Sequence, residues 1–461
     1  MNAPRSLSIA LALVLGASAS MAHADDLMQI YSEARSSDPQ LAGAEANSQA
    51  ISENVDQARS ALLPQIGASL SYSKSHGTSG GPQFVTNPDG SQSLVNVSTS
   101  SDNYSRTLSG QLDQSILDLS KWTALKSARA SAKAGDATYE AAQQDLLIRV
   151  ATFYFDVLTA EDALKFAQAN EQALGRQMEQ AQQRFDVGLS AITDVNDAKA
   201  QHDTSVANVI TARNTLDDNK EALRQLTNKE PGELKKLRDD LPLNKPNPES
   251  PDDWVNVAVA QSPVLSSYAY DLDAAKANIQ TARSGHLPTI NGRIIYSKNP
   301  RWSDNSASSF NDAFHTNSES WSTTVGLTLN VPIFSGGFTQ SRVRQSIYTR
   351  DAAQDQYELQ KRLIERSTRN SYRAVIAGVS QVEATRQAVV SAQSSLDATQ
   401  AGYEVGTRTI VDVLISQQQL LSAQSSYSQA RHAFVLNGLR LKQAAGIIEI
   451  QDLEAVNALL E

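Results

Sequence analysis

Cysteine and histidine, two residue types that often carry catalysis, are absent or few in this chain, so that an enzyme would have to be built from carboxylates alone. There is no cysteine, which excludes disulfides, thiolate metal ligands and cysteine nucleophiles. The histidines lack the HExxH spacing of zinc proteases, and no Walker loop, GxSxG turn or GxGxxG turn occurs. They are scattered along the chain at His23, His76, His202, His286, His315 and His432. We therefore expect neither an enzyme nor a bound metal or cofactor.

The overall charge and the first residues bear on partners and location. The formal net charge is −10, which argues against nucleic acid as a partner. Arg5 is followed by an apolar segment over residues 7–17 and by Ala22-His23-Ala24, a pattern typical of signal-peptide cleavage. The apolar segment is too short to span a bilayer, so we prefer a cleaved signal peptide at 1–24 to an uncleaved anchor. The mature protein should begin at Asp25 and carry no lipid.

The chain repeats its own special residues at a nearly constant separation. Four pairs are 224 residues apart: Pro39 and Pro263, Arg59 and Arg283, Pro64 and Pro288, Tyr72 and Tyr296. A second block repeats after 218 residues, where Phe185-Asp186-Val187-Gly188 corresponds to Tyr403-Glu404-Val405-Gly406. We interpret the chain as two structural repeats, 25–230 and 252–450, each with a helix, two strands, a long helix and a further helix. A Pro- and charge-rich connector at 231–251 joins them, and a C-terminal segment at 451–461 follows.

Long helices are predicted where proline is absent, between Pro88 and Pro231 and after Pro332. Apolar residues recur every seven positions at Val413, Leu420, Tyr427, Phe434 and Leu441, and before them at Val375, Val382, Val389, Leu396 and Tyr403. Such heptads indicate coiled-coil packing. The longest helices should span Asp118–Asp186 and Phe338–Glu404, roughly 100 Å each at about 1.5 Å per residue. His202 falls on a heptad position, so we interpret it as part of the seam rather than as a ligand.

Four other segments alternate apolar with small or polar residues, which is typical of membrane strands of about ten residues. They are centred on Ile66–Tyr72, Leu108–Leu112, Ile290–Tyr296 and Trp321–Val331. Aromatic residues near their ends suit an interfacial girdle: Tyr72, Tyr104, Tyr296 and Trp321. Half-buried strands of a soluble sheet are the alternative. The links Ser73–Asn103 and Lys298–Ser320 are rich in Ser, Asn and Gly, and we predict long exposed loops there.

After the signal peptide, no run of 18 apolar residues occurs, which excludes a membrane-spanning helix. A chain that crosses a membrane without one needs a closed β-barrel, because only that satisfies every backbone group in lipid. Four strands are too few, since about eight are needed to enclose even packed side chains. Several chains must therefore share the barrel: a trimer would supply about twelve strands and an open pore, a dimer about eight and a nearly filled one.

The second repeated block has the features of helix ends. Gly188 and Gly406 are placed as C-caps of the two long helices, where glycine readily adopts the left-handed conformation. Thr409 and Asp412 have the spacing of a capping box at the start of the next helix.

The segment Tyr403-Glu404-Val405-Gly406-Thr407-Arg408-Thr409-Ile410-Val411-Asp412-Val413-Leu414 resembles the periplasmic-entrance motif of the TolC family of outer-membrane efflux proteins. Residues 184–195 look like its counterpart in the first repeat. Residues 388–398 and the strand entry 331–337 add to the similarity, which runs from about Asp25 to the C-terminus.

The resemblance implies a mainly α-helical homotrimer in the outer membrane that extends into the periplasm. Four strands per chain would form a shared 12-stranded barrel over a long coiled-coil α-barrel. Such ducts serve tripartite efflux and type I secretion, and they conduct drugs, toxins or proteins. Their implied partners are outer-membrane lipid, a periplasmic adaptor protein and an inner-membrane transporter of the RND, ABC or MFS type.

The resemblance also implies a gate at the periplasmic end. Tyr403 would bond Asp194 and Gln183, and Arg408 would reach Thr193 and Asp194 across the helix pairs. Arg408 can only donate, and a charge-assisted bond to a carboxylate is among the stronger kinds.

The entrance should also carry an acidic ring, formed by Asp412 in a three-fold assembly. The family has a second acidic ring one turn further on, where this chain has Ile415, so we expect an apolar collar there. The turns at Gly188 and Gly406 would be the tips that dock on the adaptor.

Two other classes of protein stay open at this point. A periplasmic adaptor also has a long helical hairpin, but it would need lipoyl-like β-domains that the sequence does not show. A passive porin would have no use for heptad helices of this length.

Overall fold

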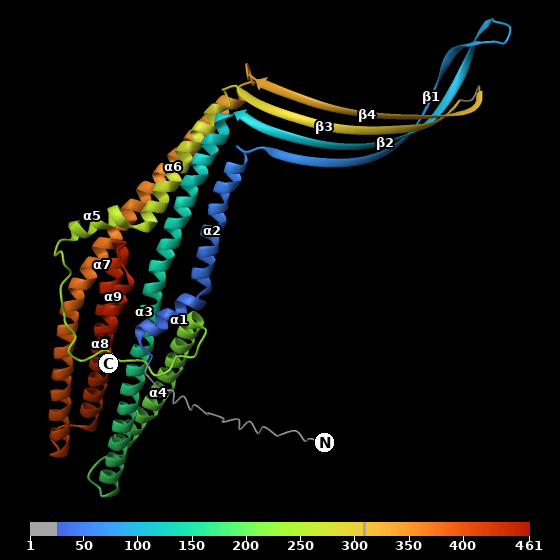
Figure 1. Cartoon of the computed structure of the whole chain (residues 1–461). Coiled ribbons are helices and arrows are strands. Elements are labelled where there is room, and N and C mark those ends of the chain that lie inside the picture. The colour runs from blue at the N-terminus through green and yellow to red at the C-terminus, as the bar shows by residue number, and fades with distance from the viewer. Residues whose placement is uncertain (1–24, 308–309) are drawn as a thin grey trace, which may run out of the picture. The chain divides into compact units, whose positions relative to one another are not determined.

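The computed structural model describes residues 25–307 and 310–461, so the predicted signal peptide at 1–24 lies outside the described residues. The order of short helix, longer helix, two strands, long helix and further helix occurs twice along the chain (Figure 1). The elements are α1 (Leu27–Ser37), α2 (Pro39–Ser60), β1 (Gln65–Thr86), β2 (Gln92–Leu117), α3 (Leu119–Asp186), α4 (Ile192–Thr227), α5 (Pro251–Gln261), α6 (Pro263–Ser284), β3 (Thr289–Ala307), β4 (Phe310–Asn330), α7 (Phe338–Glu404), α8 (Ile410–Ala444) and α9 (Ile450–Asn457).

The strands form one antiparallel sheet in the order β1-β2-β3-β4 (Figure 1). Ile66, Leu112, Ile294 and Val325 are register partners across the four strands. Residues directly opposite one another share a face of the sheet, so the apolar positions gather on one side. Ile66 is 80% exposed and Val325 is 73% exposed within the chain. The predicted alternation is therefore confirmed, and its apolar face has no cover from the described part of the chain.

The strands are much longer than the sequence predicted, and the prediction of long loops at Ser73–Asn103 and Lys298–Ser320 is wrong. β1 has 22 residues and β2 has 26, and a turn at Asn87–Ser91 closes their hairpin. Serine and threonine pair across the strands: the hydroxyl oxygens of Ser73 and Ser105 are 2.7 Å apart. The sheet thus continues through polar residues that resemble a loop when they are read one at a time.

Three aromatic residues form a cluster on the apolar side, within the strands and not at the strand ends, because the strands are longer than predicted. The rings of Tyr104 and Trp302 stack with 5.7 Å between their centroids, and Tyr72 lies 6.2 Å from Trp302. The sequence indicated Tyr72 and Tyr104 but missed Trp302, because that residue lay in a segment that was predicted to be a loop.

The long helices begin and end where the sequence predicted, within one residue. Most heptad residues are buried, including Val375, Val382 and Leu396 on α7 and Val413 and Leu420 on α8. Their burial confirms the apolar stripe. Across the residues that the structure describes, no helix combines the length and the apolar character needed to cross a membrane.

The described residues fall into two compact units. One comprises residues 25–42 together with Ala142–Ala260 and Glu365–Glu461, and the other comprises Gly43–Ala141 and Gln261–Ile364, as far as these residues are described. The second unit contains the sheet and the helix segments that join it.

The connector between the repeats is tied to the helices of the first unit. The hydroxyl of Tyr154, a fully buried residue of α3, donates to the carbonyl oxygen of Lys235 over 2.8 Å. Arg431 of α8 donates through Nη2 to the carbonyl oxygen of Leu237 over 3.1 Å. A segment without regular helix or strand is thereby held by side chains from two helices.

Candidate functional site at the two helix turns

Each long helix ends in a turn built around a glycine with positive φ. Gly188 has φ of 76° and Gly406 has φ of 79°, a conformation that a side chain would strain. The N–H of Leu189 donates to the carbonyl oxygen of Arg184 over 2.7 Å, and the N–H of Thr407 donates to that of Gly402 over 2.8 Å. These bonds satisfy carbonyl groups left open at a helix end. The predicted C-caps are confirmed.

Apolar side chains project from both turns. Val187 and Leu189 flank the first glycine with 69% and 70% exposure, and Val405 precedes the second with 76%. These side chains are available for contact with another protein.

The predicted capping box at the start of α8 is also present. The Asp412 N–H donates to Thr409 Oγ1 over 3.2 Å, and the Thr409 N–H donates to Asp412 Oδ2 over 3.0 Å. The pKa of Asp412 is lowered chiefly by the bond from the Thr409 backbone N–H, then by the Thr409 hydroxyl, which donates to Asp412 Oδ2 over 2.9 Å, and by the charge of Arg408. Asp412 is therefore held as a carboxylate. Ile415 lies one turn further on and is exposed.

The corresponding helix start in the first repeat has no such cap. Ala191 occupies the position equivalent to Thr409 and offers no side-chain acceptor. Asp194, which corresponds to Asp412, lies in the first turn of α4. Between residues 25–307 and 310–461 its carboxylate makes no hydrogen bond or ion pair. The two aspartates thus occupy equivalent positions in the repeat, but among the described residues only the Asp412 carboxylate accepts hydrogen bonds.

Tyr403 is the buried polar residue of this region. Its side chain is only 7% exposed and packs in an apolar cluster with Leu174, Leu396 and Val413. Its hydroxyl has no hydrogen-bond partner among the described residues. Burial raises the pKa of Tyr403; the Arg184 guanidinium opposes this rise and the charge of Asp194 adds to it. Asp194 is therefore close enough to act electrostatically on the phenol.

Arg184 is the direct partner of Tyr403, and the sequence analysis did not assign it to the gate. Its guanidinium carbon lies 4.8 Å from the centre of the Tyr403 ring, a cation–π contact. Its Nη1 also donates to the Tyr403 carbonyl oxygen over 3.5 Å. The last turns of α3 and α7 are joined in this way.

The bonds expected of Tyr403 and Arg408 are not made in this structure. Among the described residues Tyr403 bonds neither Asp194 nor Gln183; its hydroxyl has no hydrogen-bond partner there, and the Arg184 guanidinium lies over its ring. Arg408 reaches neither Thr193 nor Asp194 in the part of the chain that the structure describes, since it lies back over its own turn. A Cβ atom placed on Gly402 would come within 2.7 Å of Arg408 Cγ.

Arg184 and Gly402 could have been found from the repeat. They occupy equivalent positions 218 residues apart, and the small residue in the second copy leaves space for an arginine in each turn. No three His, Asp or Glu side chains of the described segments are placed to hold a metal ion.

Comparison with known proteins places these features in one family. A family model described as "Outer membrane efflux protein" matches residues 30–229 and 254–447. The outer membrane protein TolC of Escherichia coli is 39% identical over 98% of this chain and 88% of its own length. The alkaline protease secretion protein AprF of Pseudomonas aeruginosa is 27% identical over 94% of this chain and 86% of its own. A crystal structure of CusC shares the fold with a TM-score of 0.73 at 19% identity, covering 92% of each chain.

Proposed function

Because the chain belongs to the outer membrane efflux protein family, we propose that it is the exit duct for cargo delivered by an inner-membrane transporter through a periplasmic adaptor. The chain itself is an outer-membrane efflux channel of a family that forms trimers and has no enzymatic activity. Its partners, its cargo and its gate are the parts that we propose.

The exposed apolar face of the sheet is the observation that supports a position of the sheet within the membrane. A single chain leaves this face uncovered, and lipid is the solvent that suits it. Three chains with four strands each would close a barrel of about twelve strands with a lumen. The opposite, polar face would then line the water-filled duct. The repeated order of elements supports two copies of one unit at 25–230 and 252–450, joined at 231–251 and followed by 451–461.

We propose that the gate depends on two neighbouring polar groups, each without a hydrogen-bond partner among the described residues. Among residues 25–307 and 310–461, the buried Tyr403 hydroxyl makes no hydrogen bond, and the nearby Asp194 carboxylate makes none either. A bond between them would satisfy both, since a phenol donates well to a carboxylate. In the latched packing Tyr403 would swing from Arg184 to Asp194. Gln183, Thr193 and Arg408 would complete that network.

Asp412 and Ile415 would face the lumen at the entrance. Thr409 holds the Asp412 carboxylate ionised and in a fixed orientation. Three copies would form an acidic ring that attracts cations, and Ile415 would provide an apolar collar behind it.

The turns at Gly188 and Gly406 would dock on the adaptor through their exposed Val187, Leu189 and Val405 side chains. The relative AprF is named for protease secretion, which extends the proposed cargo from drugs and toxins to proteins. The transporter would then be of the RND, MFS or ABC type.

Photo-crosslinking in cells tests this function. A crosslinking amino acid at Val187 or Val405 should capture a periplasmic adaptor, whereas one at Val390, an exposed apolar residue along α7, should not. Deletion of the gene should also raise drug susceptibility or abolish secretion of a protein. Capture from Val390 alone, or a deletion strain with normal export, would contradict the proposal.

A further inference from the structure

A cavity of about 510 Å³ between α3 and α6 is lined by cations. Its walls include Lys126, Arg129, Lys133, Lys276 and the single carboxylate Asp273. All of these belong to the unit that contains the sheet. The formal charge of the chain as a whole is −10, so the positive charge of this cavity is opposite in sign to the net charge of the chain.

Within the part of the chain that the structure describes, three of these four cations have no carboxylate partner. Lys276 Nζ pairs with Asp273 at 2.9 Å. Lys133 Nζ lies 5.7 Å from the centre of the Tyr270 ring. Neither Lys133 nor Lys126 nor Arg129 forms an ion pair within the described ranges. Uncompensated positive charge in a concave wall attracts an anion.

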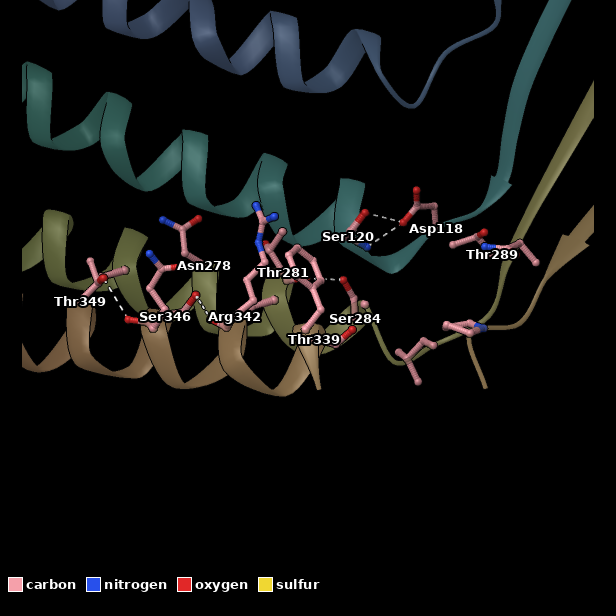
Figure 2. A pocket seen from close by; sticks show the side chains of 18 residues that line it. Asp118, Ser120, Asn278, Thr281, Ser284, Thr289, Thr339, Arg342, Ser346 and Thr349 are labelled. Atoms are coloured by element: carbon pink, nitrogen blue, oxygen red, sulfur yellow. Dashed lines mark hydrogen bonds between the residues drawn. The ribbon is translucent and has the colours of Figure 1, made fainter. Parts of the chain in front are cut away.

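A second, polar cavity, lined by the same two helices, shows on which side of the sheet each cavity opens. Figure 2 shows this cavity, with Asn278 of α6 and Thr289 of β3 among its walls. Asn330, the register partner of Thr289, also lines it, while the next pair along the strands, Ile290 and Leu329, belongs to the apolar face. Successive strand residues point to opposite faces, so the polar cavity opens on the polar side of the sheet.

The cationic cavity opens on the other side. On α6, Lys276 lies two residues from Asn278 and hence about 200° around the helix. On α3, Ser120 lines the polar cavity, and Trp122 is again two residues away. Both comparisons place the cationic cavity and Trp122 on the side of the sheet's apolar face, which would face lipid in the inserted trimer.

Trp122 is an exposed aromatic residue just beyond the end of the sheet on this side. It is 58% exposed and follows the end of β2 by five residues. Tryptophan favours the boundary between the hydrocarbon and the headgroups. Lys126, Arg129 and Lys133 follow it at spacings of four, three and four residues, which form one stripe along a helix. Lys126 and Arg129 are about 6 Å and about 10 Å below Trp122, within reach of the headgroups for long side chains.

We propose that this cavity binds the phosphate of an anionic phospholipid in the leaflet of the outer membrane that faces the periplasm. The Arg129 guanidinium would contact the phosphate through two N–H groups, and the lysines would supply point charges. Trp122 would pack beside the glycerol and the first acyl carbons. This site goes beyond the channel function and rests only on the location of the chain in the outer membrane.

Lipid titration of the purified trimer tests the site. The trimer, in an uncharged detergent, is titrated with phosphatidylglycerol, phosphatidylcholine and inorganic phosphate, and bound molecules are counted by native mass spectrometry. Wild type should bind phosphatidylglycerol at far lower concentration than the other two. The variant Lys126→Gln/Arg129→Gln/Lys133→Gln should lose about a hundredfold in affinity, since each cation near an anionic surface contributes about fivefold.

A matched control removes two lysines and one arginine elsewhere, in Lys165→Gln/Arg176→Gln/Lys199→Gln. These residues are exposed and lie outside the cavity, so this variant should bind as wild type does. If the cavity variant does not assemble into trimers, Arg129→Gln alone should lose about fivefold in affinity for phosphatidylglycerol. Equal affinity for phosphatidylglycerol and phosphatidylcholine, or unchanged binding in the cavity variants, would overturn the proposal. Inorganic phosphate binding as tightly as phosphatidylglycerol would replace the lipid by a free anion.

Discussion

Replacing Tyr403 by phenylalanine should favour the unlatched state of the channel, and the structure provides the size of the effect. The Tyr403 hydroxyl is enclosed without a partner among the described residues, and an unsatisfied buried hydroxyl costs about 1–3 kcal/mol. The substitution removes this cost from the packing seen here. In the latched packing it removes the donor to Asp194. Three chains that move together would shift the equilibrium by about 3–9 kcal/mol, and about 3 kcal/mol is already more than a hundredfold.

Single-channel recording in planar bilayers measures this shift as open probability. Tyr403→Phe keeps the ring that Arg184 covers, so the turn and the trimer should remain intact. Tyr427→Phe on α8 is the control, because an arginine also lies over that ring, with Arg431 5.5 Å from its centre, away from the proposed gate. The control should conduct as wild type does.

A double-mutant cycle with Asp194→Asn makes the prediction specific to one bond. If Tyr403 and Asp194 bond each other in the latched state, the two substitutions together should have little more effect than either alone. Strictly additive effects, or an open probability that stays at the wild-type level in Tyr403→Phe, would refute the reasoning. If the open probability of Tyr403→Phe stays at the wild-type level and the trimers are intact, the contact between Arg184 and Tyr403 stabilises the fold and has no part in the gate.

Three further changes test other parts of the molecule. Leu327→Arg, on the apolar face at 74% exposure, should destabilise the inserted trimer by about 2–4 kcal/mol, whereas Thr328→Arg on the polar face should be tolerated in a heat-lability assay. Asp412→Ala should abolish block of the single-channel current by trivalent cations, and Ile415→Asp should strengthen it; no change in the second variant would mean that residue 415 lies outside the lumen. His432 is buried, and burial lowers its pKa to about 4, so its neutral ring favours the fold at high pH and stability is lost as the pH falls from about 6.5 to about 4. In His432→Gln, the change of the free energy of unfolding with pH should be smaller by up to about 3 kcal/mol per chain. An unaltered pH profile in thermal unfolding would show that burial does not lower the pKa of His432.

Features that depend on neighbours in sequence were predictable from the sequence. The bounds of α3 and α7 follow from heptad spacing and from the positions of proline, both of which act within a few helical turns. The glycine caps at Gly188 and Gly406 and the capping box of Thr409 and Asp412 are likewise local. The alternation of apolar residues correctly indicated the two faces of the sheet.

Features that depend on partners far along the chain were decided only by the tertiary structure. Each serine-rich part of β1 and β2, taken alone, has the composition of a loop. The two parts form strands because they pair across the hairpin, where Ser73 lies opposite Ser105. The contact between Tyr403 and Arg184, which is 219 residues away in the chain, appears only in the structure.

The cationic cavity is the clearest case of this limit. Lys126 and Lys276 come from the two different repeats, and each is an ordinary solvated lysine when its own helix is considered. Their charges add only where α3 and α6 pack, with the Ser127 hydroxyl donating to the carbonyl oxygen of Ala274 over 3.2 Å. The sequence by itself determines where helices and strands form, because hydrogen bonding and periodicity are local properties of the backbone. Only packing decides which side chains share a space, because the free energy of a charge or a hydroxyl depends on everything that surrounds it.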